Sequence, residues 1–450
     1  MKRREFLSNA ALIGAGSAMG VPAILTSCAG SPKTTAKTYT PEELGMYSFV
    51  DSAPDGKPLN AALIGCGDRG TGAATQFLSA GPNLKIIAMA DVFPDRMNNS
   101  IGILKEKFNN DVPEQNRFLG FDAYQKVLAM PEIDVVLIAT PTHFHPEHLK
   151  AAVEAGKHIF MEKPAAVDPM GIRTVIAAAK AAKTKGLSIV TGNQRRHSRA
   201  YWEAYIKVRN GAIGDIISGS AHWDQGAWWN KRHRPEWSDM EYCIRNWFNI
   251  KWLSGDHLLD QGIHNIDVVT WFMGMKPTQA TGFGGRAQRL TGDIFDFFSA
   301  DYYYDKNRKM LATARQIDGC DNNVSEQVYG TKGMFSTKDD IIRLEDYEGN
   351  IIWAYDKEKN PEKNHYEQEH IHFVESIRLN KPINQAEDLA YSTLVAILGR
   401  EAAYTGKLIT WDEIMASDLR YGPETYAMGP LPDYHEGVAP RPGKAPSDPM

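Results

Sequence analysis

The feature that most constrains this chain is a glycine-rich turn that follows a short apolar run. Residues 59–64 (LNAALI) lead into the turn Gly65-Cys66-Gly67-Asp68-Arg69-Gly70. A buried strand, a G-x-G-x-x-G turn and a helix start, in this order, are typical of dinucleotide binding. The first glycine allows a tight turn, the second lets backbone approach a pyrophosphate, and the third lets the helix pack on the strand. The amides at the helix start would then face phosphates, because the helix dipole favours negative charge there.

A second apolar run, residues 84–90 (LKIIAMA), ends in Asp91. This carboxylate follows the turn by about twenty residues, where a ribose-binding acid is expected. It favours NAD over NADP, because a 2′-phosphate would meet a carboxylate, although Arg96 is close in sequence. The alternative, a plain turn beside a solvated aspartate, is weaker because both features occur in the expected context.

Apolar runs alternate with helical patterns through the first part of the chain. Residues 133–139 (IDVVLIA) are continuously apolar, which is typical of a parallel strand covered on both faces. This alternation predicts an α/β fold, with a doubly wound parallel sheet forming a Rossmann domain over residues 59–190. Strand-like patterns dominate from 278 to 355, which predicts a second α/β domain over 191–410 with a large, mostly antiparallel open sheet. Helices are expected at 95–108, 123–130, 146–156, 169–185, 255–273, 366–379 and 386–405, and a proline-rich tail at 411–450.

The amino terminus has the pattern of an export signal. Arg3-Arg4 precedes an apolar stretch that is shorter than the roughly 20 residues of a membrane span. The stretch ends in Leu25-Thr26-Ser27-Cys28, which resembles a bacterial lipobox. Residues 1–28 are therefore predicted to be a twin-arginine lipoprotein signal with Cys28 lipidated, and 29–58 a tether and arm. We expect an exported, periplasmic protein that meets the membrane only through the lipid at Cys28; the alternative is an uncleaved start of a cytosolic protein.

Composition excludes several other classes of site. The 450 residues carry a formal net charge of -5 without a basic stripe, so no nucleic-acid partner is expected. Apart from Cys28, the three cysteines lack C-x-x-C spacing and predict neither a disulfide framework nor a zinc site. His143, His145 and His148 do not have H-E-x-x-H spacing, so no metal is predicted.

Two further segments carry residues suited to chemistry. Glu162-Lys163-Pro164 follows a predicted strand at the sheet edge where ligands bind, and a lysine there can polarise an oxygen. Asp256, Asp260 and His264 are four residues apart and would share a face of the predicted helix. A carboxylate one turn from an imidazole can orient it and raise its basicity, which suits a proton acceptor. The alternative is a half-buried helix whose histidine only pairs with an aspartate.

These motifs, with the segment Thr140-Pro141-Thr142-His143-Phe144-His145, occur in one order over residues 59–410. That order resembles the glucose–fructose oxidoreductase / inositol dehydrogenase (Gfo/Idh/MocA) family. The resemblance implies an NAD-dependent oxidoreductase whose open sheet serves substrate binding and often oligomer contacts, so a homo-oligomer is expected. It implies that Lys163 is the catalytic lysine, His264 the proton acceptor and Asp260 its partner in a proton relay. It also implies cofactor contacts by Gly65, Gly67, Asp68, Arg69, Gly70, Asp91, Thr140, Pro141, His145, Glu162 and Lys163.

A tryptophan-rich segment at 222–252 departs from a minimal member of the family. It holds six tryptophans, whose indole faces could stack on sugar rings. They could equally pack inside this segment and stabilise it, or form part of a subunit interface. Arg195 and Arg196 follow another predicted strand and could reach substrate hydroxyls or lie in solvent. The expected substrate-binding residues are Lys163, Arg195, Trp247, Asp260 and His264.

Together these features predict an NAD-dependent dehydrogenase of a sugar or glycoside secondary alcohol. By family analogy, the most specific expectation is oxidation at C3 of a glucoside to a 3-keto sugar. Free NAD is not expected outside the cytoplasm, so the NAD should be tightly bound. One alternative is an NAD-dependent glycosidase on the same fold, in which the lysine matching Lys163 is typically absent. The other is a non-catalytic carbohydrate-binding lipoprotein.

Overall fold

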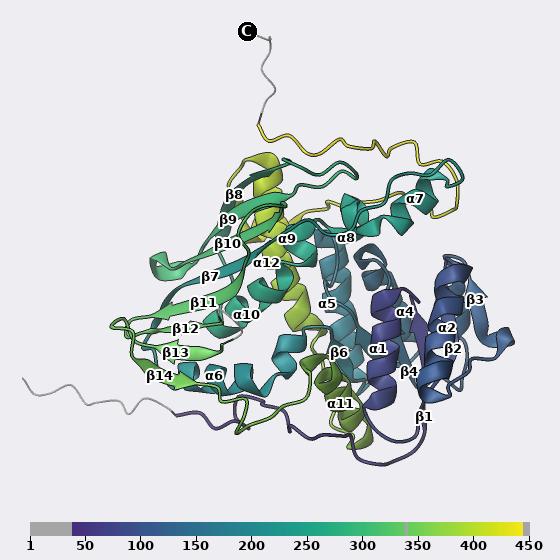
Figure 1. The fold of residues 1–450 in the computed structure, drawn as a ribbon, viewed down its shortest axis with the longest axis horizontal. Helices are drawn as coiled ribbons and strands as arrows, with labels where there is room; N and C mark the ends of the chain where they lie inside the picture. The colour runs from purple at the N-terminus through teal and green to yellow at the C-terminus, as the bar shows by residue number, and fades with distance from the viewer. Residues whose placement is uncertain (1–37, 338–340, 444–450) are drawn as a thin grey trace, which may run out of the picture. The chain divides into compact units, whose positions relative to one another are not determined.

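The computed structural model describes residues 38–337 and 341–443, so the predicted export signal and Cys28 lie outside the described residues. Within the described part, the chain forms a six-stranded parallel sheet followed by a nine-stranded, mostly antiparallel sheet (Figure 1). This confirms the predicted fold class. None of the described helices is long and apolar enough to span a membrane.

The first sheet has the strand order β3-β2-β1-β4-β5-β6, and all of its pairs are parallel. Every residue of β4 is buried, as expected for a strand covered on both faces. The order reverses between β1 and β4, and a ligand crevice is expected beyond the carboxyl ends of these strands. The strands are β1 Leu59–Ile64, β2 Leu84–Asp91, β3 Arg117–Leu119, β4 Val135–Ile138, β5 His158–Met161 and β6 Ile189–Thr191; the helices are α1 Asp68–Ser79, α2 Pro94–Phe108, α3 Ala123–Leu128, α4 His145–Glu154 and α5 Pro169–Thr184.

The second sheet has the order β14-β13-β12-β11-β7-β10-β9-β8-β15. Burial alternates along β10, where Met310, Ala312 and Ala314 are buried while Leu311 is exposed, so one face is covered and the other is open. Helices α10 and α12 pack on the covered face (Figure 1). The strands are β7 Ile216–Gln225, β8 Gln279–Gly285, β9 Phe297–Tyr303, β10 Lys309–Gln316, β11 Asn323–Gly330, β12 Met334–Ser336, β13 Arg343–Glu345, β14 Ile351–Ala354 and β15 Ile409–Thr410; the helices are α6 Arg199–Arg209, α7 Asp239–Arg245, α8 Lys251–Ser254, α9 His257–Asp260, α10 Ile263–Met273, α11 His365–Arg378, α12 Ala386–Thr405 and α13 Trp411–Ala416.

The helix predicted for 255–273 is interrupted, so that prediction is wrong in its continuity. Helix α9 ends at Asp260 and α10 begins at Ile263. The amide of Gly262 donates to the carbonyl of His257, and that of His264 donates to Gln261, so the ladder loses its regular spacing of four. Asp256, Asp260 and His264 therefore do not share the face of one helix.

The tail after α13 is packed against the rest of the chain and runs past α7 (Figure 1). The amide of Met240 donates to the carbonyl of Gly429, and the amide of Leu431 donates to Asp239. Besides two larger apolar cores, the described chain has a smaller one, the third core, against which Tyr421 and Tyr426 pack. The third core consists of Phe93, Phe144, Met240, Tyr242, Cys243, Ile244, Ile250, Trp252 and Leu253. The tail thus connects segments that are far apart in sequence.

Candidate active site

The glycine turn has the backbone geometry that a phosphate-binding turn needs. Gly65 has a φ of 93°, and a Cβ there would lie 2.7 Å from the Ala139 carbonyl. A Cβ at Gly70 would overlap the carbonyl oxygen of Gly65, whereas a Cβ at Gly67 would have no neighbour closer than 3.9 Å. Helix α1 starts at Asp68 without a side-chain cap, which leaves its first amides for a ligand. Gly65 and Gly70 thus have no room for a side chain, whereas Gly67 leaves open space above the turn, and these residues fit a dinucleotide.

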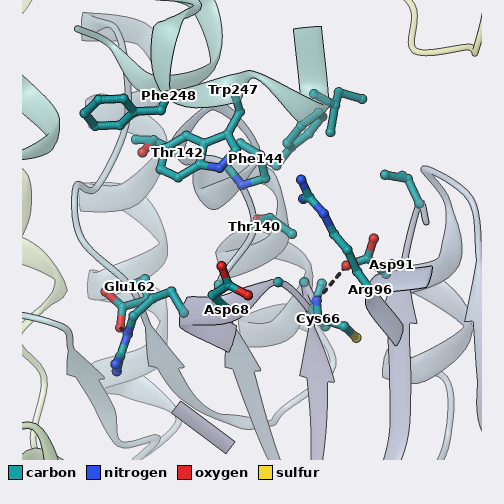
Figure 2. Close-up of a pocket in the computed structure, with 18 of the residues that line it drawn as sticks. Cys66, Asp68, Asp91, Arg96, Thr140, Thr142, Phe144, Glu162, Trp247 and Phe248 are labelled. Atoms are coloured by element: carbon teal, nitrogen blue, oxygen red, sulfur yellow. Dashed lines mark hydrogen bonds and ion pairs between the residues drawn. The ribbon is translucent and has the colours of Figure 1, made fainter. Parts of the chain in front are cut away.

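A cavity of about 960 Å³ extends from this turn along the carboxyl ends of the parallel strands. Its size is at the upper end of the range for small-molecule and cofactor sites. Figure 2 shows Cys66, Asp68 and Asp91 on one side of the cavity, with Trp247 and Phe248 across from them. Lys163, Asp260 and His264 line the same cavity. The predicted catalytic residues and the predicted cofactor residues other than Gly70 and His145 therefore share one cavity.

Asp91 holds the glycine turn as well as lining the cavity. Its carboxylate accepts hydrogen bonds from the amide of Cys66 (2.6 Å) and the amide of Phe93 (2.8 Å). Burial raises the pKa of Asp91, while these amides and Arg96 act in the opposite direction. The guanidinium of Arg96 lies 5.1 Å from the Phe93 ring and also lines the cavity. The Asp91 side chain therefore lies at the position expected for ribose contacts.

Lys163 is held by the interruption between α9 and α10. Its Nζ donates to the carbonyl of Asp260 (2.5 Å) and lies 3.7 Å from Oδ1 of the same residue. That carbonyl is available because the His264 amide, its partner in a regular helix, donates to Gln261 instead. The broken helix therefore positions the lysine.

His264 is buried beside two cationic side chains. Burial, with Lys163 and Arg195 nearby, holds the pKa of His264 well below its usual range. The expected rise in basicity from Asp260 is therefore not found: Oδ2 of Asp260 accepts from Gln261 (2.7 Å), and among the described residues Asp260 makes no hydrogen bond to His264. The His264 ring lies 5.3 Å from that of Trp223. A neutral imidazole in this position can accept a proton.

Glu162 and Arg69 brace the backbone at Lys163. One carboxylate oxygen of Glu162 pairs with Nε of Arg69, and the other accepts the amide of Lys163 (3.2 Å). Arg69 also donates to Gln76 (2.8 Å) and lies 3.6 Å from Glu369 on α11. Burial next to Glu162 raises the pKa of Glu369 well above its usual range. No sequence motif pointed to Glu369, or to the cavity-lining Tyr366 and Gln261, because their roles depend on long-range packing.

Several predicted residues lie at the edges of the site. Thr140 and Pro141 line the cavity, but His145 does not; its ring is buried between the carbonyls of Thr140 (2.8 Å) and Pro164 (2.7 Å). His145 therefore joins two cavity-lining segments rather than facing the cavity. Among the described residues, no group of three or more His, Cys, Asp or Glu side chains is placed to hold a metal ion.

Neither of the two predicted arginines lies free in solvent. Arg195 pairs with Glu326 and Asn265, and its guanidinium lies 5.6 Å from the Trp223 ring. It shares a small cavity with Lys163 and His264, so it is close to the catalytic residues. Arg196 forms two 2.9 Å hydrogen bonds with Asp267 and is structural.

The tryptophans of 222–252 divide by position. Trp252 is buried in the third core. Trp228, Trp229 and Trp247 line the cavity, and Trp247 lies across from Asp68 and Thr140 (Figure 2). The predicted substrate contact at Trp247 is therefore placed over the glycine turn.

Comparison with known proteins agrees with this geometry. Residues 59–189 match the model described as the oxidoreductase family with an NAD-binding Rossmann fold, and residues 201–336 match the GFO/IDH/MocA C-terminal domain. The chain belongs to the Gfo/Idh/MocA family. Its cofactor is NAD, because the glycine turn and Asp91 lie within the matched NAD-binding region.

Two curated relatives illustrate the range of this family. One is a glycosyl hydrolase family 109 protein of Streptomyces coelicolor, 28% identical over 49% of this chain and 45% of its own length. The other is the scyllo-inositol 2-dehydrogenase (NAD(+)) of Bacillus subtilis, 28% identical over 50% of this chain and 57% of its own length. The chain thus spans about half of the length of each relative. Among solved structures, levoglucosan dehydrogenase in complex with NADH and levoglucosan shares the fold, with a TM-score of 0.63, 20% identity and coverage of 79% of this chain and 99% of the other.

Proposed function

We propose that this protein is an NAD-dependent dehydrogenase that oxidises a secondary alcohol of a sugar or glycoside. The observation that carries the proposal is the convergence of Lys163, Asp260 and His264 at the cavity that begins at the glycine turn. The curated inositol dehydrogenase and the solved levoglucosan dehydrogenase support a polyol or sugar substrate. The most specific form of the proposal is oxidation at C3 of a glucoside to a 3-keto sugar.

The mechanism assigns one task to each polar side chain. Bound NAD supplies the acceptor for the hydride that leaves the alcohol carbon. The Lys163 ammonium, held by Asp260, offsets the negative charge that develops on the reacting oxygen. The neutral imidazole of His264 accepts the hydroxyl proton. Because the resulting imidazolium lies near Lys163 and Arg195, it releases the proton to solvent and returns to the neutral form.

We further infer export and lipid attachment through Arg3-Arg4 and Cys28, which lie outside the described residues. A folded, NAD-loaded protein could cross the membrane by the twin-arginine route. Replacing Cys28→Ala should then release the protein into the soluble periplasmic fraction. Unchanged membrane fractionation would contradict the anchor.

We also infer a homo-oligomer formed through the open face of the second sheet. Phe283 on β8 and Leu311 on β10 are exposed on that face, 66% and 36% respectively. Apolar side chains exposed on an open sheet favour burial against a partner. Light scattering should give a mass above that of one chain, and a monomer would contradict this inference.

The test of the proposed reaction is the absorbance of the purified protein near the reduced-nicotinamide band. Addition of a glycoside substrate should raise this absorbance in protein that retains NAD, and extraction should release NAD(H) rather than NADP(H). No change with any glycoside, in protein that contains NAD, would contradict the dehydrogenase.

A second candidate is an NAD-dependent glycosidase that oxidises its substrate only transiently. The family 109 relative favours it, whereas the presence of Lys163 favours the dehydrogenase. Release of reducing sugar without net formation of NADH would identify the glycosidase.

A further inference from the structure

The cavity is enclosed on the side opposite the glycine turn by residues 226–248, which we call the roof. The roof follows β7, runs without regular structure to residue 238, and includes α7. The roof residues Trp228, Trp229, Lys231, Trp247 and Phe248 line the same cavity as residues 65–69 of the glycine turn. The roof therefore faces the part of the cavity that fits the dinucleotide (Figure 2).

Besides the packing of Phe93 and Phe144 in the third core, one ion pair among the described residues joins the roof to the nucleotide-binding half. Both terminal nitrogens of Arg245 donate to Asp95 on α2, each at 3.1 Å. The Arg245 guanidinium also stacks 3.9 Å from the Phe93 ring and bonds Glu241 at 2.7 Å. We call the Arg245–Asp95 pair the clasp. Because Phe93 and Glu241 already hold the Arg245 side chain, little side-chain entropy is lost when Arg245 pairs with Asp95.

The roof is also suited to contact a dinucleotide directly. The rings of Trp228 and Phe248 are 5.0 Å apart, and Trp229 packs on both Trp247 and Phe248. Trp228 nevertheless remains 47% exposed and Trp229 38% exposed. Exposed aromatic faces can stack on the flat rings of a dinucleotide. The roof also carries cations: burial, together with repulsion from Arg96 and Arg245, lowers the pKa of Lys231. A phosphate-bearing ligand would relieve that repulsion.

We propose that the roof is a second cofactor-binding wall that encloses NAD between itself and the glycine turn, with the clasp setting the rate at which NAD leaves. The inference rests on NAD binding, which the family match establishes, and not on which sugar is oxidised. It assigns cofactor contacts to Lys231 and Trp247, which come from outside the Rossmann fold.

The test is the rate at which NADH leaves the full-length protein, followed by the loss of its fluorescence after dilution into excess NAD. Asp95→Ala opens the clasp and should accelerate release about tenfold or more, and Trp247→Ala should do the same by removing a roof contact. The matched control is Asp305→Ala, because Asp305 pairs with Arg308 at 3.0 Å and both aspartates are 61% exposed. Trp353→Ala on β14 is the control for the indole, and both controls should release NADH at the wild-type rate.

Equal release rates for wild type, Asp95→Ala and Trp247→Ala would overturn the proposal, as would equal acceleration by Asp305→Ala. Thermal unfolding checks that each variant is folded. If Trp247→Ala fails to fold, the half-exposed Asp95 still provides the test, and Asp95→Asn should give an intermediate rate. Failure of the wild type to act on any glycoside would instead contradict the proposed function and leave these rates interpretable.

Discussion

The floor of the cavity, residues 65–70 with the strand ends beside them, and the roof enclose one space by different means. The floor depends on backbone: a methyl group at Gly70 has no room, and the amides at the start of α1 are uncapped. The roof depends on side chains from distant segments, joined by the Arg245–Asp95 clasp and the third core. A change in the floor should therefore abolish NAD binding, whereas a change in the roof should alter how long NAD stays.

The largest effect is expected for Gly70→Ala in the floor. Its Cβ would overlap the Gly65 carbonyl oxygen, so the variant should lose NADH binding and about 3 kcal/mol of stability. NADH fluorescence titration and urea unfolding measure both. The control is Gly102→Ala in α2, where no atom lies within 4 Å of the new Cβ and alanine should stabilise the helix by about 0.5–1 kcal/mol. Wild-type NADH affinity in Gly70→Ala would contradict a floor built on close backbone packing.

Lys163 and His264 line the cavity that the floor and the roof enclose, and their substitution should affect mainly turnover. Lys163→Ala and His264→Ala should lower kcat by about a hundredfold or more, because their contribution is made to the transition state. NAD content and KM should change far less. Lys180→Ala, an exposed lysine on α5, serves as the control. Wild-type turnover of glycosides in both site variants would refute hydride transfer at this site.

A buried histidine on α11 should make the protein sensitive to acid. His370 packs 4.1 Å from the Phe160 ring, and burial holds its pKa well below its usual range. The unfolded chain, with a histidine pKa of about 6.5, then binds more protons than the folded one below that pH. Stability is therefore full above about pH 6.5 and falls as pH decreases, by up to about 1.4 kcal/mol per pH unit for this residue.

His370→Phe should remove that share of the acid sensitivity, as measured by urea unfolding at pH 7.5 and 5.5. The exposed His435→Phe is the control. An unchanged pH dependence in His370→Phe would show that this ring does not remain neutral in the folded protein.

The smallest effect is expected where the tail meets the third core. The Tyr426 hydroxyl lies 2.7 Å from Nε2 of His143. Tyr426→Phe should cost about 1 kcal/mol of unfolding free energy, the value of one hydrogen bond, and leave turnover unchanged. Faster loss of NAD from this variant would show that the tail also helps to retain the cofactor.

The parallel sheet and the floor could be predicted from the sequence because their determinants are local. Strand β4 is a run of apolar residues, and the glycine turn follows β1 directly. That the second sheet is mostly antiparallel could be predicted for the same reason, because apolar and polar residues alternate along strands such as β10. By contrast, helical periodicity predicted one helix for 255–273, although Gly262 within that range was a local sign of the interruption at Gln261–Gly262.

The sequence by itself therefore determined which residues could carry the chemistry: the glycines, Asp91, Lys163 and His264 are all identified by motif and order. Only the tertiary structure decided how they are held. Packing turned the Asp260 carbonyl toward Lys163, placed Glu369 behind Arg69, and brought Trp247 over the glycine turn. The physical reason is range. Strand and turn formation depend on neighbours along the chain, whereas a buried pair such as Arg69–Glu369 forms only when segments three hundred residues apart are packed together.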